Sequence, residues 1–195
     1  MTQAPGIDRR AFVRDLLQRC PDALVVTGLG SPTYDVFAAG DREENFYLWG
    51  AMGGAAAIGL GLALAQPQRS VLVITGDGEQ LMGLGMLATI GAQQPPNLAV
   101  VVLDNGHYGE TGMQRSHTSL GTRLADVARA CGIADSEEIR EPQHVAALAQ
   151  RVNARQGCSF AQVLVTAHEW PRALPARDGV YLKNRFRAAL GLQPF

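Results

Sequence analysis

Residues 74–112 read ITGDGEQLMGLGMLATIGAQQPPNLAVVVLDNGHYGETG, and this stretch decides the fold. One apolar run breaks at the tripeptide GDG (residues 76–78), a helical pattern follows, and a second apolar run ends at DNG (residues 104–106). Two parallel strands joined by a crossover helix bring both strand ends to the same edge of the sheet. The stretch therefore predicts a βαβ unit in which Asp77 and Asn105 lie close together.

The patterns on both sides of this unit continue the alternation of helix and strand. Strands are expected at residues 23–27, 46–48, 70–75, 97–103, 136–140 and 160–165. Besides the helix between the two central strands, helices are expected at residues 9–19, 32–38, 52–65, 123–131, 143–155 and 183–190. Six short strands separated by helices predict an α/β fold: a doubly wound, mostly parallel six-stranded sheet with helices on both faces. In such sheets ligands bind beyond the carboxyl ends of the strands.

Length and composition fit a single globular domain. Residues 1–195 suffice for one domain with a sizeable core, and we expect residues 170–195 to form a C-terminal extension that contacts another subunit. The formal net charge of −1 gives no reason to expect nucleic acid or an anionic membrane as partner. No secretory pattern precedes Asp8, and the apolar run at residues 51–65 is too short to span a membrane. A cytoplasmic location is therefore expected.

The two strand ends carry side chains that suit a hard cation. The Asp77 carboxylate and the Asn105 amide oxygen are ligands that Mg²⁺ takes together with phosphate oxygens and water. A helix that begins at Glu79, next to the small Gly78, would let backbone N–H groups approach that phosphate. An isolated GDG also fits a structural turn with a capping aspartate, so these residues alone leave both interpretations open.

A second glycine-rich segment reads WGAMGGAAAIGLGLALAQP at residues 49–67. It places Met52 at the mouth of a helix that is rich in small residues. Taken by themselves, the Gly and Ala residues of this segment also fit the tight packing of a helix on a sheet, which requires no ligand.

Together these segments resemble the diphosphate-binding domain of thiamine diphosphate (ThDP) enzymes, in which a GDG turn, a later asparagine and a G-x-M-G turn hold the cofactor. The motifs GAMGGAAAIGLGLALAQP, GDGEQLMGLGMLATIG, PPNLAVVVLDN and YGETGMQ, within residues 50–114, are similar to those of phosphonopyruvate and sulfopyruvate decarboxylases. The sulfopyruvate enzymes consist of two short subunits, and this chain resembles their diphosphate-binding β subunit. The resemblance implies the ThDP-binding fold and the cofactors ThDP and Mg²⁺.

The resemblance also implies roles for individual residues. Mg²⁺ would be held by Asp77, Asn105 and the carbonyl of His107. The cofactor would be bound by Gly30, Ser31, Gly50, Met52, Gly76, Asp77, Gly78, Glu79, Asn105 and Tyr108. Catalytic positions would be His107, Glu110, Thr111 and Gln114, which line the cavity above the thiazolium ring. Many relatives have a small residue in place of Glu79; a carboxylate facing the diphosphate would repel it, so we expect only the Glu79 backbone N–H to contribute.

The activity that the resemblance implies is the non-oxidative decarboxylation of a small 2-oxo acid to an aldehyde by a ThDP-dependent carboxy-lyase. In that family a glutamate from a separate pyrimidine-binding domain activates the cofactor, and nothing in this chain resembles that domain. Glu43 and Glu44 lie in the charged turn DREEN and are expected to be solvated. We therefore expect a pyrimidine-binding α subunit that completes a shared active site in a hetero-oligomer.

Other polar residues near the expected cavity have open roles. His107 and Glu110 are candidates for a proton relay, although the His107 ring could instead be solvated. Arg115 and His117 could steer a second acidic group of the substrate, or could belong to a mobile polar loop. A metal pair of His107 and His117 has weak support, because a loop of about ten residues separates them. The two remaining histidines receive no role.

Three other interpretations stay open. The chain could be a subunit of a ThDP-dependent carboligase that resembles acetolactate synthase, or of a decarboxylase for another 2-oxo acid. It could be a non-catalytic nucleotide- or phosphate-binding domain: GLGMLA (residues 83–88) matches G-x-G-x-x-A, but inside an expected helix instead of at a strand-to-helix turn. It could also be an inactive scaffold, against which the intact Asp77, Asn105 and Met52 argue.

Overall fold

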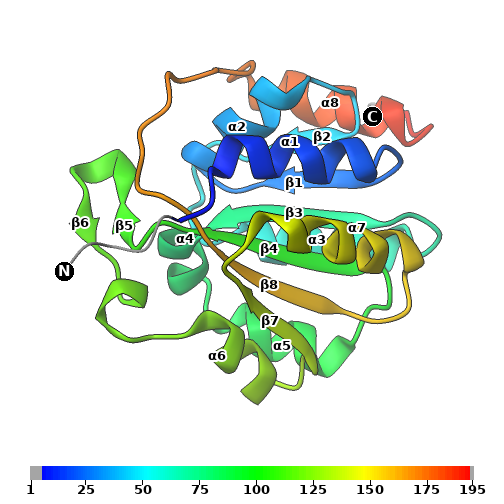
Figure 1. The fold of residues 1–195 in the computed structure, drawn as a ribbon. Helices are drawn as coiled ribbons and strands as arrows, with labels where there is room; N and C mark the ends of the chain where they lie inside the picture. The colour runs from blue at the N-terminus through cyan, green and yellow to red at the C-terminus, as the bar shows by residue number, and fades with distance from the viewer. Residues whose placement is uncertain (1–5, 194–195) are drawn as a thin grey trace.

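The computed structural model describes residues 6–193 and shows a six-stranded parallel sheet with helices on both faces (Figure 1). The strands of this sheet are β1 (Leu24–Thr27), β2 (Asn45–Tyr47), β3 (Val71–Gly76), β4 (Leu98–Asp104), β7 (Asp135–Ile139) and β8 (Ser159–Leu164). Their order is β2-β1-β3-β4-β8-β7, and every neighbouring pair is parallel. The predicted doubly wound α/β fold is confirmed.

Helices cover the sheet because its strands are apolar on both faces. They are α1 (Arg9–Arg19), α2 (Ser31–Ala39), α3 (Ala55–Ala65), α4 (Asp77–Met82), α5 (Met86–Gln93), α6 (Leu124–Ala130), α7 (Val145–Ala154) and α8 (Gly179–Ala189). One core lies between the sheet and α1, α2 and α7, and the other between the sheet and α3, α5 and α6. Residues along β3 alternate between them: Leu72 and Ile74 enter the first core, Val71 and Val73 the second.

Among the residues that the structure describes, no helix is long and apolar enough to cross a membrane. The apolar run at residues 51–65 supplies the helix α3, which has 11 residues and is buried on one face only, since Ile58 and Leu64 are exposed. Its small side chains let it pack directly on the sheet, where Ala56, Leu60 and Ala63 enter the second core.

The strand order gathers the candidate site residues at one edge of the sheet. β1, β3 and β4 lie side by side, with Thr27 paired to Ile74 and Gly76 paired to Leu103. The chain therefore leaves all three strands at the same edge. The helix α4 and a short hairpin, β5 (His107–Tyr108) and β6 (Gln114–Arg115), lie at that end of the molecule (Figure 1).

The turn before α3 differs from the expected helix over residues 52–65. Ala51 has a φ of 48° and Gly53 a φ of 95°, and both lie in the left-handed region that a right-handed helix excludes. The helix consequently begins at Ala55, and Met52 lies on an irregular turn in front of it.

The helix that follows GDG also differs from expectation. It begins at Asp77 instead of Glu79, with Gly76 as its N-cap. The backbone then leaves helical conformation between α4 and α5, at residues 83–85. A Cβ on Gly83 would lie 2.3 Å from the Gly53 carbonyl, so this break is where α4 meets the turn before α3. The G-x-G-x-x-A match therefore begins between two helices and follows no strand.

The C-terminal helix α8 closes the β2 edge of the sheet (Figure 1). Leu182 enters the first core and Phe186 the second, so the helix spans the border between them. Arg185 forms an ion pair with Asp41 at 2.6 Å. The extension expected to contact another subunit thus packs against the sheet of its own chain, and a contact between subunits stays a prediction.

Candidate functional site

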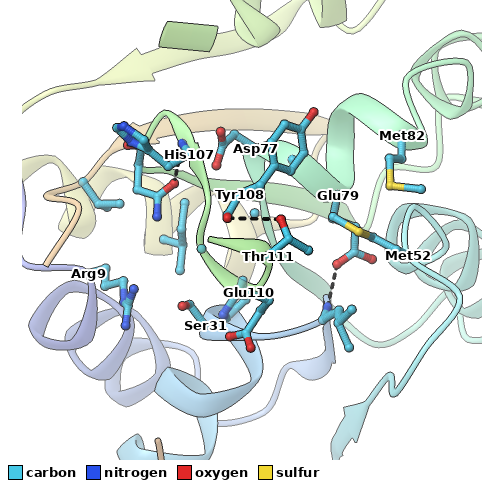
Figure 2. Close-up of a pocket in the computed structure, with 18 residues that line it drawn as sticks. Arg9, Ser31, Met52, Asp77, Glu79, Met82, His107, Tyr108, Glu110 and Thr111 are labelled. Carbon is cyan, nitrogen blue, oxygen red and sulfur yellow. Dashed lines mark hydrogen bonds between the residues drawn. The ribbon is translucent and has the colours of Figure 1, made fainter. Parts of the chain in front are cut away.

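A cavity of about 320 Å³ lies at the carboxyl edge of the sheet (Figure 2). Most residues singled out from the sequence line it: Ser31, Met52, Gly76, Asp77, Gly78, Glu79, Asn105, His107, Tyr108, Glu110 and Thr111. Gly30, Gly50 and Gln114 do not line it. The fold therefore brings residues from four places in the sequence together around one space: residue 31, residue 52, residues 76–79 and residues 105–111.

Asp77 is the first residue of α4 and is almost fully buried at the cavity wall. Its carboxylate accepts hydrogen bonds from the hydroxyls of Ser116 and Thr118, the latter at 3.3 Å. The Thr118 hydroxyl also lies 2.7 Å from Asp104, whose other oxygen accepts from Gln162 at 2.7 Å. Burial, and then the charge of Asp104, raises the pKa of Asp77 to about 6. Two carboxylates this close favour a cation beside them.

Asn105 and His107 form a tight turn after β4. The His107 backbone N–H donates to Asn105 Oδ1 at 2.9 Å, and the His107 ring Nδ1 lies 2.8 Å from the Asn105 carbonyl. Within residues 6–193, no cluster of three or more His, Cys, Asp or Glu side chains could hold a metal. The available ligands are instead the Asp77 carboxylate, the Asn105 amide oxygen and a backbone carbonyl. This oxygen set fits Mg²⁺ completed by phosphate and water, and does not fit zinc.

Gly78 leaves space for two side chains that face it. A Cβ at this position would lie 2.6 Å from the Tyr108 ring, so a larger residue would displace that ring. The Met52 methyl group would lie 3.7 Å from the same Cβ. Because Met52 is 37% exposed, its flexible apolar side chain is available at the cavity mouth to support a bound ring.

The Glu79 carboxylate is buried among backbone donors. It accepts hydrogen bonds from Leu29 N at 2.6 Å, drawn as a dashed line in Figure 2, and from Ala55 N at 3.3 Å. Gly28 makes room for it, since a Cβ there would lie 2.1 Å from Glu79 Oε2. Burial raises the pKa of Glu79, while these backbone donors lower it. The carboxylate thus joins the loop after β1 to the start of α3, which accounts for a charged residue at this position.

Glu110 lies beside the start of α2. A Cβ on Gly30 would be 2.9 Å from Glu110 Cγ, and Arg172 pairs with the Glu110 carboxylate at 3.1 Å. Thr111 Oγ1 donates to Gln114 Oε1 at 2.9 Å, and both side chains are exposed. The structure therefore brings Glu110 and Thr111 to the cavity, whereas Gln114 lies on the hairpin outside the lining.

Other polar residues considered from the sequence lie outside the cavity lining: Glu43, Glu44, Arg115 and His117. Glu43 is exposed and Glu44 half-buried, so neither is placed as a buried acid. His168, which received no role, packs edge-on against Trp170 with ring centroids 4.9 Å apart. It lines a smaller cavity that adjoins the first one.

Four residues of this region were not singled out from the sequence: Arg9, Asp104, Ser116 and Thr118. Asp104 directly precedes Asn105 at a strand end, and this position could have identified it as a site residue from the sequence. Ser116 and Thr118 come from a loop after the hairpin, and no periodic pattern predicts its path back to Asp77. Arg9 opens an amphipathic helix, whose spacing indicates an apolar face and says nothing of a cavity.

Comparison with known proteins identifies the family. The family described as "Thiamine pyrophosphate enzyme, C-terminal TPP binding domain" matches residues 34–163. "Sulfopyruvate decarboxylase subunit beta" of Methanocaldococcus jannaschii is 46% identical over 110 residues, which are 56% of this chain and 58% of that one. The same subunit of Methanococcus maripaludis is 41% identical over 127 residues, 65% of this chain and 68% of that one. "Phosphonopyruvate decarboxylase" of Streptomyces viridochromogenes is 48% identical over 125 residues, 64% of this chain and 31% of that one.

Solved structures share the fold. The thiamine diphosphate-dependent 4-hydroxybenzoylformate decarboxylase of Rhodococcus jostii RHA1 superposes with a TM-score of 0.72 at 18% identity, over 87% of this chain and 34% of that one. The chain spans little more than half of the first sulfopyruvate subunit named above and less than a third of the phosphonopyruvate enzyme. What these comparisons have in common is the cofactor-binding domain: the chain belongs to the family of C-terminal, TPP-binding domains of thiamine pyrophosphate enzymes.

Proposed function

We propose that this chain is the ThDP- and Mg²⁺-binding β subunit of a two-subunit 2-oxo acid decarboxylase, similar to the sulfopyruvate and phosphonopyruvate enzymes. One observation carries the proposal: a single cavity at the carboxyl edge of the sheet is lined by Asp77, Asn105 and Met52, which come from three separate segments. The names of the relatives support the reaction class, since they are sulfopyruvate and phosphonopyruvate decarboxylases.

Most of the residues expected to bind ThDP lie around the cavity. Backbone N–H groups at Ser31 and at residues 78–79 would receive the diphosphate. Asp77, Asn105 and the His107 carbonyl would hold the Mg²⁺ that neutralises it. On the preceding turn, the Gly50 carbonyl and Met52 would support the aminopyrimidine ring.

When bound, ThDP supplies the carbon nucleophile and the electron sink that decarboxylation of a 2-oxo acid requires. The residues of the chain would hold the cofactor, shield it from water and supply protons. Met52 and Tyr108 would place apolar surface against the bound cofactor. Glu110 and Thr111 place a carboxylate and a hydroxyl at the cavity, where a proton can be held. With a pKa of about 6, the Asp77 carboxyl is ionised at neutral pH and available to a cation.

The second wall of the site would come from an α subunit. Among the described residues, Glu79 is the one buried glutamate, and its carboxylate is held by backbone donors. A pyrimidine-binding partner would therefore supply the activating acid and cover the exposed Met52 and Met82, in a cytoplasmic hetero-oligomer. The substrate would be a small 2-oxo acid with a second acidic group, as the relatives' names suggest.

Calorimetric titration of ThDP with Mg²⁺ into the full chain, alone and with its partner subunit, tests the proposal. We expect binding that appears or tightens with the partner, followed by release of CO₂ and an aldehyde from sulfopyruvate or phosphonopyruvate. Formation of acetolactate from pyruvate would favour the carboligase alternative instead. Folded protein that binds no ThDP in either mixture would contradict the proposal and favour a phosphate-binding domain or a scaffold.

A further inference from the structure

Arg9 places a buried positive charge at the wall of the cavity. It is the first residue of α1, and only 5% of its surface is exposed. Among the described residues that line the main cavity, it is the one arginine or lysine. It also lines the adjoining cavity of about 70 Å³, so it stands where the two spaces meet.

Asp35 holds Arg9 in place without cancelling the local charge. The carboxylate of Asp35 is fully buried and pairs with two arginines, Arg9 Nε at 2.8 Å and Arg10 Nε at 3.0 Å. Arg10 also donates to the Pro171 carbonyl at 3.0 Å and lines neither cavity. In the described part of the chain, Asp35 is the one polar partner of the Arg9 guanidinium. Two guanidinium groups and one carboxylate leave one positive charge in surplus.

The acidic groups of the cavities do not supply the missing anion. Glu79 is held by backbone donors, and Glu110 pairs with Arg172 at 3.1 Å. Asp77 is surrounded by the hydroxyls of its own network, at the proposed metal position. Glu169, at the smaller cavity, is exposed to solvent. Because a buried charge is costly without a partner, the anion that faces Arg9 is expected to arrive with a ligand.

The neighbours of Arg9 indicate which part of a ligand it meets. Ser31 and Asn105 line both cavities, as Arg9 does. Ser31 begins α2, where the proposed diphosphate would meet backbone N–H groups, and Asn105 is a proposed metal ligand. Met52 and Met82 lie on the opposite side of the cavity from Arg9 (Figure 2). Arg9 is therefore at the phosphate end of the proposed cofactor site, away from the pyrimidine end.

We propose that the guanidinium of Arg9, oriented by Asp35, binds the terminal phosphate of ThDP, an inference that rests on the proposed function. A planar guanidinium presents paired donors that match two oxygens of a tetrahedral oxyanion. The sulfonate or phosphonate of a substrate offers the same kind of oxyanion, so the experiment has to separate the two sources.

The test uses the full chain with its partner subunit and Mg²⁺, and compares Arg9→Gln with the matched control Arg10→Gln. Each variant removes one of the two cations that face Asp35, but only Arg9 lines the cavities. Calorimetry gives Kd for ThDP and for thiamine monophosphate, which lacks the terminal phosphate. We expect Arg9→Gln to weaken ThDP binding about 10- to 100-fold and to leave thiamine monophosphate binding unchanged. Arg10→Gln should change neither, and Arg9→Lys should recover part of the loss.

Three patterns would overturn the assignment to the terminal phosphate. Equal losses for the two thiamine phosphates, or equal losses in the two glutamine variants, would show that Arg9 only completes a structural ion pair. An unchanged Kd for ThDP, combined with a raised KM for sulfopyruvate but not for pyruvate, would assign Arg9 to the acidic group of the substrate.

A second experiment distinguishes a failure of this inference from a failure of the proposed function. If the wild-type complex binds no ThDP, the proposed function fails, and inorganic pyrophosphate with Mg²⁺ becomes the probe on the same proteins. Pyrophosphate binding that Arg9→Gln weakens and Arg10→Gln preserves would support a diphosphate site at Arg9. Pyrophosphate binding that is absent, or unaffected by Arg9→Gln, would overturn it.

Discussion

Asp77 and Glu79 are separated by one residue, yet their carboxylates meet different surroundings. Asp77 faces hydroxyl donors and the nearby Asp104, and its pKa is raised to about 6. Glu79 faces the backbone N–H groups of Leu29 and Ala55. One turn of helix therefore carries a carboxylate available to a cation and another that is committed to the backbone.

Asp77→Asn should stabilise the cation-free chain at neutral pH while abolishing Mg²⁺-dependent ThDP binding. Burial raises the pKa of Asp77 above the ordinary value for an aspartate, so its ionised form lowers stability above about pH 6, and this destabilisation is relieved as pH falls toward about 4. The gain at neutral pH should be about 1 to 3 kcal/mol and should shrink at about pH 5. Urea unfolding with chelator at both pH values measures it; the same gain at each pH would argue against a raised pKa.

Glu79→Ala should destabilise the chain by about 2 to 4 kcal/mol, because two backbone donors, the buried one of Ala55 and the partly buried one of Leu29, lose their acceptor. Glu79→Gln keeps the shape but points an N–H₂ group at one of those donors, so we expect an intermediate loss. The exposed Glu43→Ala is the matched control and should stay within about 0.5 kcal/mol of wild type. Chemical denaturation measures all three; a Glu79→Ala chain as stable as the control would mean that water replaces the carboxylate at no cost.

Among the helices, α3 shows how glycine positions the site. Gly59 faces the sheet, where an added Cβ would lie 2.2 Å from Val73 Cγ2, whereas a Cβ on Gly61 would meet nothing within 4 Å. The close approach at Gly59 draws the helix onto β3. It thereby sets the depth of the turn that carries Met52 in front of α3.

Gly59→Ala and Gly61→Ala should therefore have opposite effects on stability. The first overpacks the interface with β3 and should destabilise the chain by about 1 to 3 kcal/mol. The second adds helix propensity at an exposed position and should stabilise it by about 0.5 to 1 kcal/mol. Unfolding curves of the two variants, recorded side by side, decide the matter; effects of the same sign would contradict the packing described for α3.

Helices and strands whose caps and apolar patterns lie within or next to them in sequence could be predicted. The irregular turns that connect them could not. The helix expected at residues 9–19 has those bounds, because Asp8 caps it directly by accepting from Ala11 N at 2.9 Å. The start of α3 expected from the sequence lies three residues too early, since the left-handed φ of Ala51 has no signal in its side chain. The position of residues at strand ends, such as Asp77, at the carboxyl edge of the sheet could be predicted from general βαβ topology. Ser116 and Arg9 reach the cavity from distant segments, and local patterns do not encode such approaches.

For the molecule as a whole, the exposed methionines beside the cavity suggest where the proposed partner subunit would attach. Met52 and Met82 are exposed at the mouth, on the side opposite Arg9 (Figure 2). Methionine suits an interface because its flexible, polarizable side chain adapts to the surface it meets. A partner on this face would cover the cavity, and its residues would form the second wall of the site beside the carboxyl edge of this sheet.

Met82→Lys should weaken assembly with the partner subunit by about tenfold or more, because it places an unpaired charge in an apolar contact. Val180→Lys on α8 is the matched control: both side chains are 62% exposed, and α8 lies along the β2 edge. Sedimentation velocity of the mixed subunits measures the affinity, and circular dichroism of each variant checks the fold. Equal assembly of both variants would place the partner on another face.

The two outer strands of the sheet are protected in different ways, and this affects the chain while it is being made. β7 carries Asp135, Glu137 and Glu138, and charged side chains at an edge discourage another strand from pairing with it. β2 has no such charges and depends on α8, which packs along it. A ribosome delivers β2 long before α8. The growing chain therefore keeps one edge open to strand addition by its neighbours until residues 179–189 have emerged, and nascent chains stalled before that point are the ones expected to aggregate.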